Sequence, residues 1–505
     1  MKICLITPPS GFLMDERVFP NLGILKVASS LLARPGIRVD KIDCSGVVNY
    51  PDVISDYCLN GCPDAFGITA TTPQLPAVSK ILKIIKNLKP SAKTILGGPH
   101  VTLVNAARKR EEGRNIKGRA SRAFESLSGM ADVLVAGDGE EAIFLALQPN
   151  APNLIDADNP GDLSLWLTNQ KLEELPFPAR QLLDLSSYRY SIDGISATSL
   201  IAQLGCPYPC GFCGGRESPA FRRVRTRSSD HVVAEIIYLH ENYGYQAFML
   251  YDDELNVNPN ILELMRKLRE AQDNLRVEFR LRGFIKANLF KDEQADAMYQ
   301  AGFRWILVGF ESGSPRILTN INKRSTLEEN TRCVEIARRH NLKVKALMSL
   351  GHPGESAETI RQTEDWLLRI KPDDFDATII TEFPGTPYYD YSEPVPGQPG
   401  TWVYTYIRTG ERTGDRLFSQ EIDYGEIANY YKGNPFETEG YRAYVWTDFL
   451  SAEELVAHRN DLEFRVRSSL KIPFPSSNAA QRYEHSMGQM SFPANILRSS
   501  SVARV

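Results

Sequence analysis

The chain has 505 residues, of which 42% are hydrophobic and 24% are charged. This length exceeds what one ordinary hydrophobic core needs, so we expect about two to four domains. With 58 basic and 62 acidic residues the formal net charge is only −4, which argues against bulk binding to nucleic acid or to an anionic membrane.

Residues 1–147 predict a doubly wound, Rossmann-like parallel sheet. Strand-like runs alternate with helical stretches such as 22–33 and 77–89, at roughly 30 residues per unit. The expected strands are residues 2–7, 37–43, 64–69, 93–98 and 132–137. Ligands on such sheets bind beyond the carboxyl ends of the strands, where glycine lets the backbone approach them closely. The segments at those ends are "TPPSG" (7–11), "TATTPQ" (69–74), "GGPH" (97–100) and "GDGE" (137–140).

Residues 148–195, rich in Pro, Asn and Asp, predict a linker. Between 196 and 390 the alternation returns with six βα-like units, fewer than the eight of a closed barrel, so we expect a partial (β/α)6 barrel of the TIM type. The expected strands are 197–205, 247–253, 277–282, 304–312, 343–351 and 376–383. Residues 391–505 begin with a Pro/Gly-rich break and predict a smaller, α-rich C-terminal region that closes the site. One helical run covers 451–470, and the Ser-rich tail is expected to be ordered only in part.

No apolar run approaches the length of about 20 residues that a membrane-spanning helix needs. The first residues, "MKICLITPPSGF", have too short an apolar run for a secretory signal and instead predict a buried strand. Eight cysteines in a chain of this length do not make a disulfide scaffold. We therefore expect a cytoplasmic protein with reduced thiols and with neither a membrane nor a nucleic acid as its partner.

Three of the eight cysteines stand within the stretch "LGCPYPCGFCGG" (204–215), as Cys206, Cys210 and Cys213. Thiolates bind soft or borderline metals, and a structural zinc site needs four ligands. Nowhere else does the chain hold a second C-x2-C. Three thiolates with one open position suit an iron–sulfur cluster whose free iron chelates a substrate. A zinc knuckle or three loosely placed thiols are the alternatives.

A C-x3-C-x2-C loop after the first strand of a six-unit barrel resembles the radical SAM superfamily. The resemblance implies that the three cysteines hold a [4Fe–4S] cluster. The amino and carboxylate groups of S-adenosylmethionine (SAM) would chelate the fourth iron, and Phe212 would lie by the adenine. The missing fourth cysteine is thereby explained, because it would occupy the place of SAM.

Further segments resemble the superfamily in order along residues 195–390. "YDDE" (251–254) falls where a Gly-Gly-Glu-like motif holds the SAM amino group, although the glycines are missing. "FRLRG" (279–283) falls where an arginine meets the SAM carboxylate, and "VGFESGS" (308–314) resembles the ribose motif. "SLGHPGES" (349–356) and "EFPGTPYY" (382–389) resemble the endings of the fifth and sixth strands. The SAM contacts implied are Asp252, Asp253, Arg280, Arg282, Glu311 and Ser312. Helix caps, surface arginines and, for His352, a turn are the alternatives.

The first domain resembles the cobalamin-binding domain that is fused to one large radical SAM class. "PNLGILKVASSL" (20–31), "GITATT" (67–72), "LGGPHVT" (96–102) and "VAGDGEEA" (135–142) occur in that family's order. The D-x-H-x-x-G motif, whose histidine ligates cobalt in mutases, is missing, so the 69–74 loop would cover the lower face of cobalt. The cobalamin contacts implied are Pro8, Thr71, Thr72, Gln74, Gly97, Gly98, His100, Gly137 and Glu140. Ordinary turn chemistry, or a plain nucleotide-binding sheet without G-x-G-x-x-G, is the alternative.

Together these resemblances imply a cobalamin-dependent radical SAM C-methyltransferase. It would methylate an unactivated carbon of a small-molecule or peptide metabolite through a 5′-deoxyadenosyl radical and methylcobalamin. A low-potential donor such as flavodoxin or ferredoxin would supply electrons, and enzymes of this kind often serve natural product biosynthesis. A cyclase or rearrangement enzyme with the same cofactors, and a non-catalytic iron–sulfur redox or sensor protein, are the alternatives. A tRNA-modifying enzyme is disfavoured because the sequence shows no basic RNA-binding module.

Overall fold

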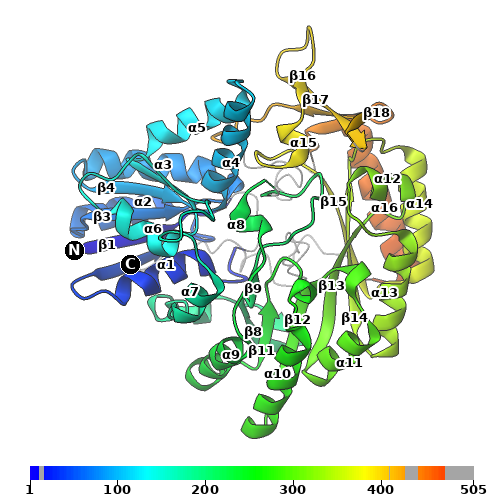
Figure 1. Ribbon diagram of the computed structural model, residues 1–505, viewed down its shortest axis with the longest axis horizontal. Coiled ribbons are helices and arrows are strands. Elements are labelled where there is room, and N and C mark those ends of the chain that lie inside the picture. Colours follow the sequence, from blue (N-terminus) through cyan, green and yellow to red (C-terminus); the bar gives the residue numbers. More distant parts are fainter. Residues whose placement is uncertain (11–15, 216, 409, 427–441, 473–505) are drawn as a thin grey trace.

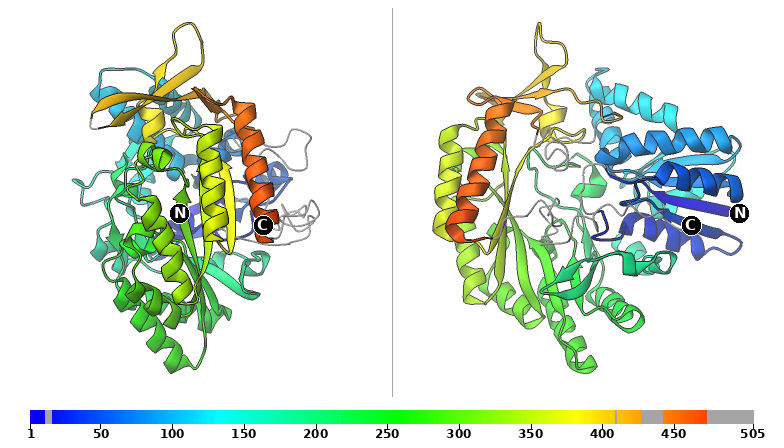
Figure 2. Two further views of the ribbon diagram at one scale, coloured as in Figure 1. Left: turned by 90° about the vertical axis from the view of Figure 1, so that its right-hand side faces the viewer. Right: turned by 180° about the vertical axis from the view of Figure 1, so that it is seen from behind.

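The computed structural model describes residues 1–10, 16–215, 217–408, 410–426 and 442–472. A first sheet with its helices lies beside a second, strongly curled sheet, and a small third sheet caps one end of the second (Figures 1 and 2). Within the described ranges no helix has both the length and the apolar character needed to cross a membrane.

The first sheet has six parallel strands in the order β2-β1-β3-β4-β5-β6. They are β1 (Lys2–Thr7), β2 (Arg38–Asp43), β3 (Ala65–Thr69), β4 (Lys93–Gly97), β5 (Val133–Gly137) and β6 (Leu154–Ala157). Its helices are α1 (Leu22–Leu32), α2 (Tyr50–Asn60), α3 (Leu75–Leu88), α4 (Pro99–Gly113), α5 (Arg119–Met130) and α6 (Gly139–Ala146). Helices α1 and α6 bury one face of the sheet, and α2 to α5 bury the other. The doubly wound sheet expected from the sequence is confirmed.

The first sheet extends into the stretch expected to be a linker. Strand β6 pairs in parallel with β5, and Ala179 donates its backbone N–H to the carbonyl of Leu25 in α1 at 3.1 Å. The short helix α7 (Asn169–Glu174) follows β6. Apolar residues within 148–195 therefore complete the core of the first sheet, although the abundance of Pro, Asn and Asp there suggested only turns.

The second sheet is the partial barrel that the sequence predicts. Six parallel strands run in the order β15-β14-β13-β12-β11-β8, and β7 is added antiparallel at the edge. The strands are β7 (Ser191–Ile192), β8 (Ile195–Leu200), β11 (Ala247–Leu250), β12 (Arg280–Ile285), β13 (Phe303–Glu311), β14 (Lys343–Leu350) and β15 (Asp374–Ile379). The outer helices are α9 (Ser229–Tyr243), α10 (Ile261–Leu275), α11 (Asp292–Gln300), α13 (Leu327–Arg339) and α14 (Ala357–Ile370).

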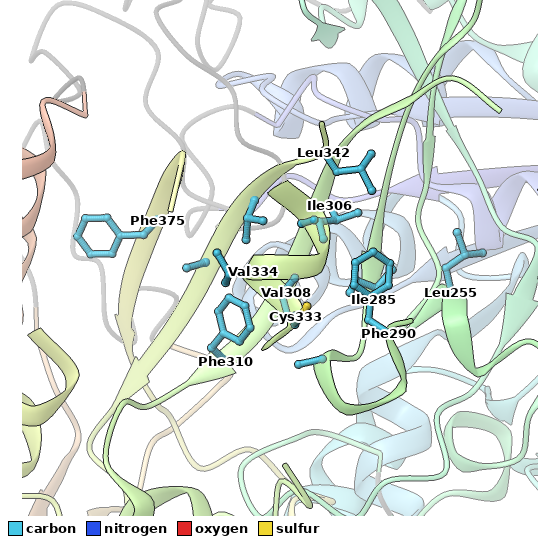
Figure 3. Close-up of a cluster of buried hydrophobic side chains, with 14 of the residues drawn as sticks. Leu255, Ile285, Phe290, Ile306, Val308, Phe310, Cys333, Val334, Leu342 and Phe375 are labelled. Carbon is cyan, nitrogen blue, oxygen red and sulfur yellow. The ribbon is translucent and has the colours of Figure 1, made fainter. Parts of the chain in front are cut away.

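The outer face of this sheet is closed by apolar packing. Ile306, Val308 and Phe310 of β13 belong to one buried cluster with Cys333 and Val334 of α13 (Figure 3). Alternate residues of a strand point to opposite faces, so the residues between them face the barrel interior. Cys333 is accordingly a residue of this core.

The C-terminal region differs from the α-rich region expected. It forms a four-stranded antiparallel sheet of β16 (Glu393–Pro394), β17 (Thr401–Arg408), β18 (Glu411–Gln420) and β19 (Val445–Thr447). The one helix expected there is present as α16 (Ala452–Leu470), which packs on β15 and α14. The tail expected to be ordered only in part lies, from residue 473, outside the described residues.

Candidate active site between the two sheets

The three cysteines lie on the loop that leaves the carboxyl end of the first barrel strand. This loop runs from the short strand β9 (Gln203–Leu204) to α8 (Pro219–Arg222). Cys206 and Cys210 are buried, Cys213 is half-buried, and all three are free thiols. The N–H of Cys206 donates to Phe221 O at 2.9 Å, and that of Cys213 to Cys210 O at 3.2 Å. In the described part of the chain no three His, Cys, Asp or Glu side chains, these thiols included, are gathered as a metal site.

Glycine 211 lets this loop lie flat against a tyrosine ring. The N–H of Tyr388, in α15 (Pro387–Asp390), donates to Gly211 O at 3.0 Å, and Gly211 N–H donates to Ile321 O at 2.9 Å. A Cβ added at Gly211 would lie 2.2 Å from the Tyr388 ring. The loop is therefore fixed between the sixth strand's exit and the segment after α12 (Pro315–Asn320).

Two buried lysines stand beside the cysteine loop. Lys323 Nζ lies 3.0 Å from Glu311 Oε1, and Lys286 Nζ donates to Lys323 O at 2.9 Å and stands 4.0 Å from the centre of the Tyr208 ring. Burial lowers the pKa of Lys286, whereas Glu311 outweighs burial and raises the pKa of Lys323. Both lysines interact electrostatically with Cys210, so two cations stand next to the cysteine loop.

A chain of buried hydrogen bonds continues from Glu311. Ser349 Oγ donates to Glu311 Oε2 at 2.8 Å and lies 2.8 Å from His352 Nε2, while His352 Nδ1 is 3.3 Å from Tyr388 Oη. Burial would raise the pKa of Glu311, but Lys323 and the Ser349 hydroxyl hold it below its usual value. Burial lowers the pKa of His352 to about 4. The imidazole is therefore neutral at neutral pH, and it meets the Phe212 ring edge to face at 5.2 Å.

Glu311 ends β13 with a left-handed backbone, at φ +66°. For a residue other than glycine this conformation costs about 1–3 kcal/mol, and such strain gathers at functional sites. The other residue of the sequence motif, Ser312, bonds to α14 and to its own turn. The Ser312 hydroxyl bonds the Thr363 hydroxyl at 3.2 Å and receives the N–H of Ser314 at 3.1 Å. Glu311 is therefore connected to the cysteine loop through Lys323, whereas the side-chain bond of Ser312 leads to α14.

Of the two aspartates expected to contact SAM, Asp252 connects the end of β11 to the segment that follows β8. Its Oδ1 receives the N–H of Ala202 at 2.9 Å and that of Gln203, and burial raises the pKa of Asp252 to about 7. Asp253 is exposed. The motif reading did not select the next residue, Glu254. In the structure the charges of Lys286 and Lys323 act on the Glu254 carboxyl group.

The strand that carries Arg280 and Arg282 is shifted along the sequence relative to the expected one. The strand expected over 277–282 runs instead over Arg280–Ile285, so both arginines lie in its first half. Arg280 pairs with Glu278 at 3.2 Å, and the Arg282 guanidinium stands 5.5 Å from the Trp305 ring. At about 3.3 Å per residue, Arg282 is some 13 Å short of position 286 along the strand. The cation at the strand end is Lys286, which the lysine directly after "RLRGFI" could have signalled.

A cavity of about 450 Å3 opens between the two sheets. Its wall on the first sheet includes four of the residues expected to contact cobalamin: Gly97, Gly98, Gly137 and Glu140. Its opposite wall includes Leu204 and Gly205, directly before Cys206, together with Ala220 and Phe221. Gly137 has φ +90°, and a Cβ there would lie 2.4 Å from Asp158 N, so only glycine fits this strand end. Gln203 Oε1 is buried in the same wall without a hydrogen-bond partner among the described residues.

The remaining residues of the expected cobalamin contacts form a second group at the same sheet edge, outside the cavity wall. Gln74 Nε2 donates to Pro8 O at 2.7 Å, and Gln74 Oε1 receives the Thr71 N–H at 2.9 Å. Thr72 Oγ1 lies 2.9 Å from His100 Nδ1. Burial lowers the pKa of His100 to about 3, so this imidazole is neutral. These five residues form a polar platform made of two hydrogen-bonded groups, one of Pro8, Thr71 and Gln74 and one of Thr72 and His100.

Comparison with known families decides the identity of the two parts. Residues 200–367 match the Radical SAM superfamily, and residues 16–128 match the B12 binding domain. The chain belongs to the cobalamin-dependent radical SAM enzymes. Its cofactors are accordingly SAM, an iron–sulfur cluster and cobalamin.

Relatives of this cobalamin-dependent radical SAM enzyme include methyltransferases and cyclases. An "uncharacterized methyltransferase" of Pyrococcus horikoshii is 28% identical over 400 residues, which is 78% of this chain and 83% of the relative. The anaerobic magnesium-protoporphyrin IX monomethyl ester cyclase of Synechocystis is 24% identical over 414 residues, 77% of either chain. The radical SAM methyltransferase TsrM of Kitasatospora setae, solved with cobalamin and a [4Fe–4S] cluster, shares the fold. It has a TM-score of 0.63 and 18% identity, and the match covers 91% of this chain and 90% of TsrM.

The residues present suit these cofactors. Three thiols on one loop are the donor set of a cluster with one open iron, and the nearby lysines offset its negative charge. The interdomain cavity, with a glycine-rich rim and an unpaired amide oxygen, suits the nucleotide tail of cobalamin.

Proposed function

We propose that this enzyme is a cobalamin-dependent C-methyltransferase acting on an unactivated carbon of a small molecule or peptide. The observation that carries the proposal is the shared cavity wall, because residues next to Cys206 and the glycine-rich ends of β4 and β5 line one space. Two cofactor sites in such proximity suit a reaction that uses both on one substrate. The methyltransferase of Pyrococcus horikoshii, matched over most of both chains, supports methyl transfer.

We infer that Cys206, Cys210 and Cys213 converge as thiolates on the cluster. When bound, the cluster and SAM supply a hydrogen-abstracting radical, and cobalamin supplies a methyl group. Lys286 and Lys323 stabilise the thiolates, and Phe212, held against His352, offers a flat wall to an adenine ring. Burial keeps His352 neutral, so it holds the Ser349 hydroxyl on Glu311 without adding a charge.

For SAM the geometry supports Glu311, which the motifs suggested, together with Lys286 and Glu254, which they did not. Lys286 is the cation for its carboxylate, and Glu254 with Glu311 faces its ammonium and ribose. All three lie at carboxyl ends of barrel strands or in the loops that follow them, where barrel enzymes gather their chemistry. Gly97, Gly98 and Gly137 let the backbone approach the cobalamin tail, and the platform of Pro8, Thr71, Thr72, Gln74 and His100 faces the corrin side of the sheet.

The test begins with anaerobic reconstitution, followed by measurement of iron and cobalamin per protein. We expect a cluster and near-stoichiometric cobalamin in the wild type. Cys206→Ala should lose the cluster absorbance, while Cys62→Ala, which removes an exposed thiol of the first domain, should keep it. SAM with a low-potential donor, flavodoxin or ferredoxin, should then yield both S-adenosylhomocysteine and 5′-deoxyadenosine. Protein that binds iron but no cobalamin would refute the proposal.

A cyclase is the second candidate, because the Synechocystis cyclase matches 77% of this chain. A cyclisation consumes SAM as a radical source only. It would therefore give 5′-deoxyadenosine and no S-adenosylhomocysteine, and the ratio of the two products separates the candidates.

A further inference from the structure

The loop that carries the three cysteines returns through residues 217–226, here called the return arm. Its two limbs lie tightly against each other. The N–H of Cys206 donates to Phe221 O at 2.9 Å, and a Cβ added at Gly205 would lie 2.2 Å from Arg223 O. Because so little room separates the limbs, a shift of the return arm would move Cys206 as well.

The first contact that fixes the return arm comes from Asp158, the residue directly after β6 of the first sheet. Asp158 Oδ1 receives the Ser218 hydroxyl at 2.9 Å and the Ala220 N–H at 2.7 Å. Asp158 and Ser218 are only 2% and 0% exposed. Hydrogen bonds to a carboxylate are stronger than those between neutral groups, and a buried donor that loses its acceptor is costly. The arm is therefore bound firmly to the end of β6.

The second contact joins Arg225, near the end of the arm, to Asp138, which stands between β5 and α6. Two guanidinium nitrogens of Arg225 bond the two carboxylate oxygens of Asp138, one of them at 3.2 Å. The same guanidinium donates to Leu167 O at 3.1 Å and lies 4.3 Å from the centre of the Trp166 ring. The side chains of Arg225 and Asp138 are 5% and 10% exposed. A planar fork on two oxygens fixes the orientation of the arm as well as its distance from the first sheet.

Two further contacts lie at the ends of the return arm. Glu217 pairs with Arg110 of α4 at 2.5 Å, and the Thr226 N–H donates to Asn169 Oδ1 at 3.0 Å. All four contacts lead to residues of the first sheet, its helices or the stretch that follows β6. The first domain therefore binds the return arm along its whole length, although the arm belongs to the loop of a barrel strand.

We propose that Asp138 and Asp158 are positioning residues for the iron–sulfur cluster, because they fix the return arm and, through it, the place of the Cys206 thiol. The first domain thus has a second task besides binding its own cofactor: the cysteine loop takes the shape that accepts a cluster only against this domain. The inference rests on the cluster assigned under the proposed function, and it does not depend on methyl transfer.

The experiment follows hydrogen exchange of the full chain before reconstitution, and then iron content and the electron paramagnetic resonance spectrum of the reduced cluster. Asp158→Leu removes both acceptor bonds at similar volume. We expect exchange within 203–226 to become about 10- to 100-fold faster, as for lost hydrogen bonds to a charged group, and exchange in β1 to β5 to stay within about twofold. Bound iron should fall and the spectrum should broaden, because the cysteines are no longer held in one arrangement. Arg225→Met should act in the same direction.

Asp158→Asn keeps a carbonyl acceptor and should stay close to the wild type in all three measurements. Matched controls are Arg223→Met, an exposed arginine of the same arm, and Asp162→Asn, whose carboxylate receives the Ser164 N–H of its own turn at 3.0 Å. Both should behave as the wild type does.

Four results would overturn the positioning role and leave the proposed function intact. They are unchanged exchange within 203–226 in Asp158→Leu, equal acceleration throughout the first sheet, faster local exchange with an unaltered cluster, and an effect of Asp158→Asn as large as that of Asp158→Leu. A wild type that assembles no cluster would overturn the proposed function as well.

Discussion

Arg119 of α5 joins the first sheet to the barrel and to the C-terminal sheet. Its removal should weaken the contacts that hold these three parts together. Its guanidinium lies 3.5 Å from the Tyr389 ring centre and 4.4 Å from that of Trp402. It pairs with Glu382 at 3.1 Å and donates to Tyr389 O at 2.7 Å. The side chains of Arg119 and Glu382 are 5% and 3% exposed, and Glu382 also receives the Ser419 hydroxyl at 2.7 Å.

Arg119→Met keeps much of the apolar stem but leaves the Glu382 carboxylate buried and unpaired. Removing one member of a buried pair costs about 3–5 kcal/mol. We therefore expect a loss of that size in the free energy of unfolding, measured with urea and tryptophan fluorescence. The double variant with Glu382→Gln should recover most of it, because no buried charge remains.

The control is Arg122→Met, whose partner Glu421 lies 2.9 Å away in a pair that is 53% and 38% exposed. Such a pair contributes about 0.2–1 kcal/mol. If Arg119→Met cost no more than Arg122→Met, or if the double variant were less stable than Arg119→Met, the argument from burial would be refuted.

Further predictions concern the cysteine loop and its surroundings. Gly211→Ala should prevent cluster assembly, seen as lost absorbance after reconstitution, because its Cβ would overlap a ring at 2.2 Å. Gly214→Ala, whose Cβ meets methyl groups at 3.7 Å, should assemble it normally. The pKa of His352 falls from 6.5 to about 4 on folding, so the unfolded chain binds the proton more tightly and stability falls as the pH drops below 6.5. His352→Gln should reduce that fall by about 2 kcal/mol between pH 7 and pH 5 in urea unfolding, and an unchanged slope would contradict the buried neutral imidazole. Lys286→Met should lower the affinity for SAM about tenfold in equilibrium dialysis, whereas Arg280→Met should not; the reverse result would restore the motif-based assignment.

The sequence predicted the parallel sheets well because their signal is local. Buried parallel strands are short apolar runs separated by amphipathic helices, and both patterns can be read within one unit. The register of the third barrel strand could not be read in this way. The expected strand ended at Arg282, but Gly283 lies inside β12, where a Cβ would stand 3.3 Å from Leu250 O. A close approach between neighbouring strands is a tertiary contact that the sequence pattern does not show, so the end of β12, after which Lys286 follows, could not be placed from the sequence.

The sequence of the C-terminal sheet has the alternating pattern of a strand, which its many aromatic residues made difficult to recognise. In β17, "TWVYTYIR", Tyr404 and Tyr406 are buried while their neighbours are half-buried, which is the alternation of a strand with one covered face. Glu140 was expected from the sequence as a cobalamin contact, but Lys26 was not. Charged residues on helices are usually solvated, and only the cavity shows that Lys26 lines the same space.

Strand β6 has a consequence for how the chain is made. The first sheet is completed by residues 154–157, and Ala179 is fastened to α1 beyond them. During synthesis the edge of β5 therefore stays unpaired until β6 has left the ribosome, and an open edge is a template for pairing with other chains. A fragment cut at residue 147 would keep that edge permanently and should aggregate. A fragment that continues through Leu182 includes β6, which pairs with the edge of β5, and should remain a monomer in solution.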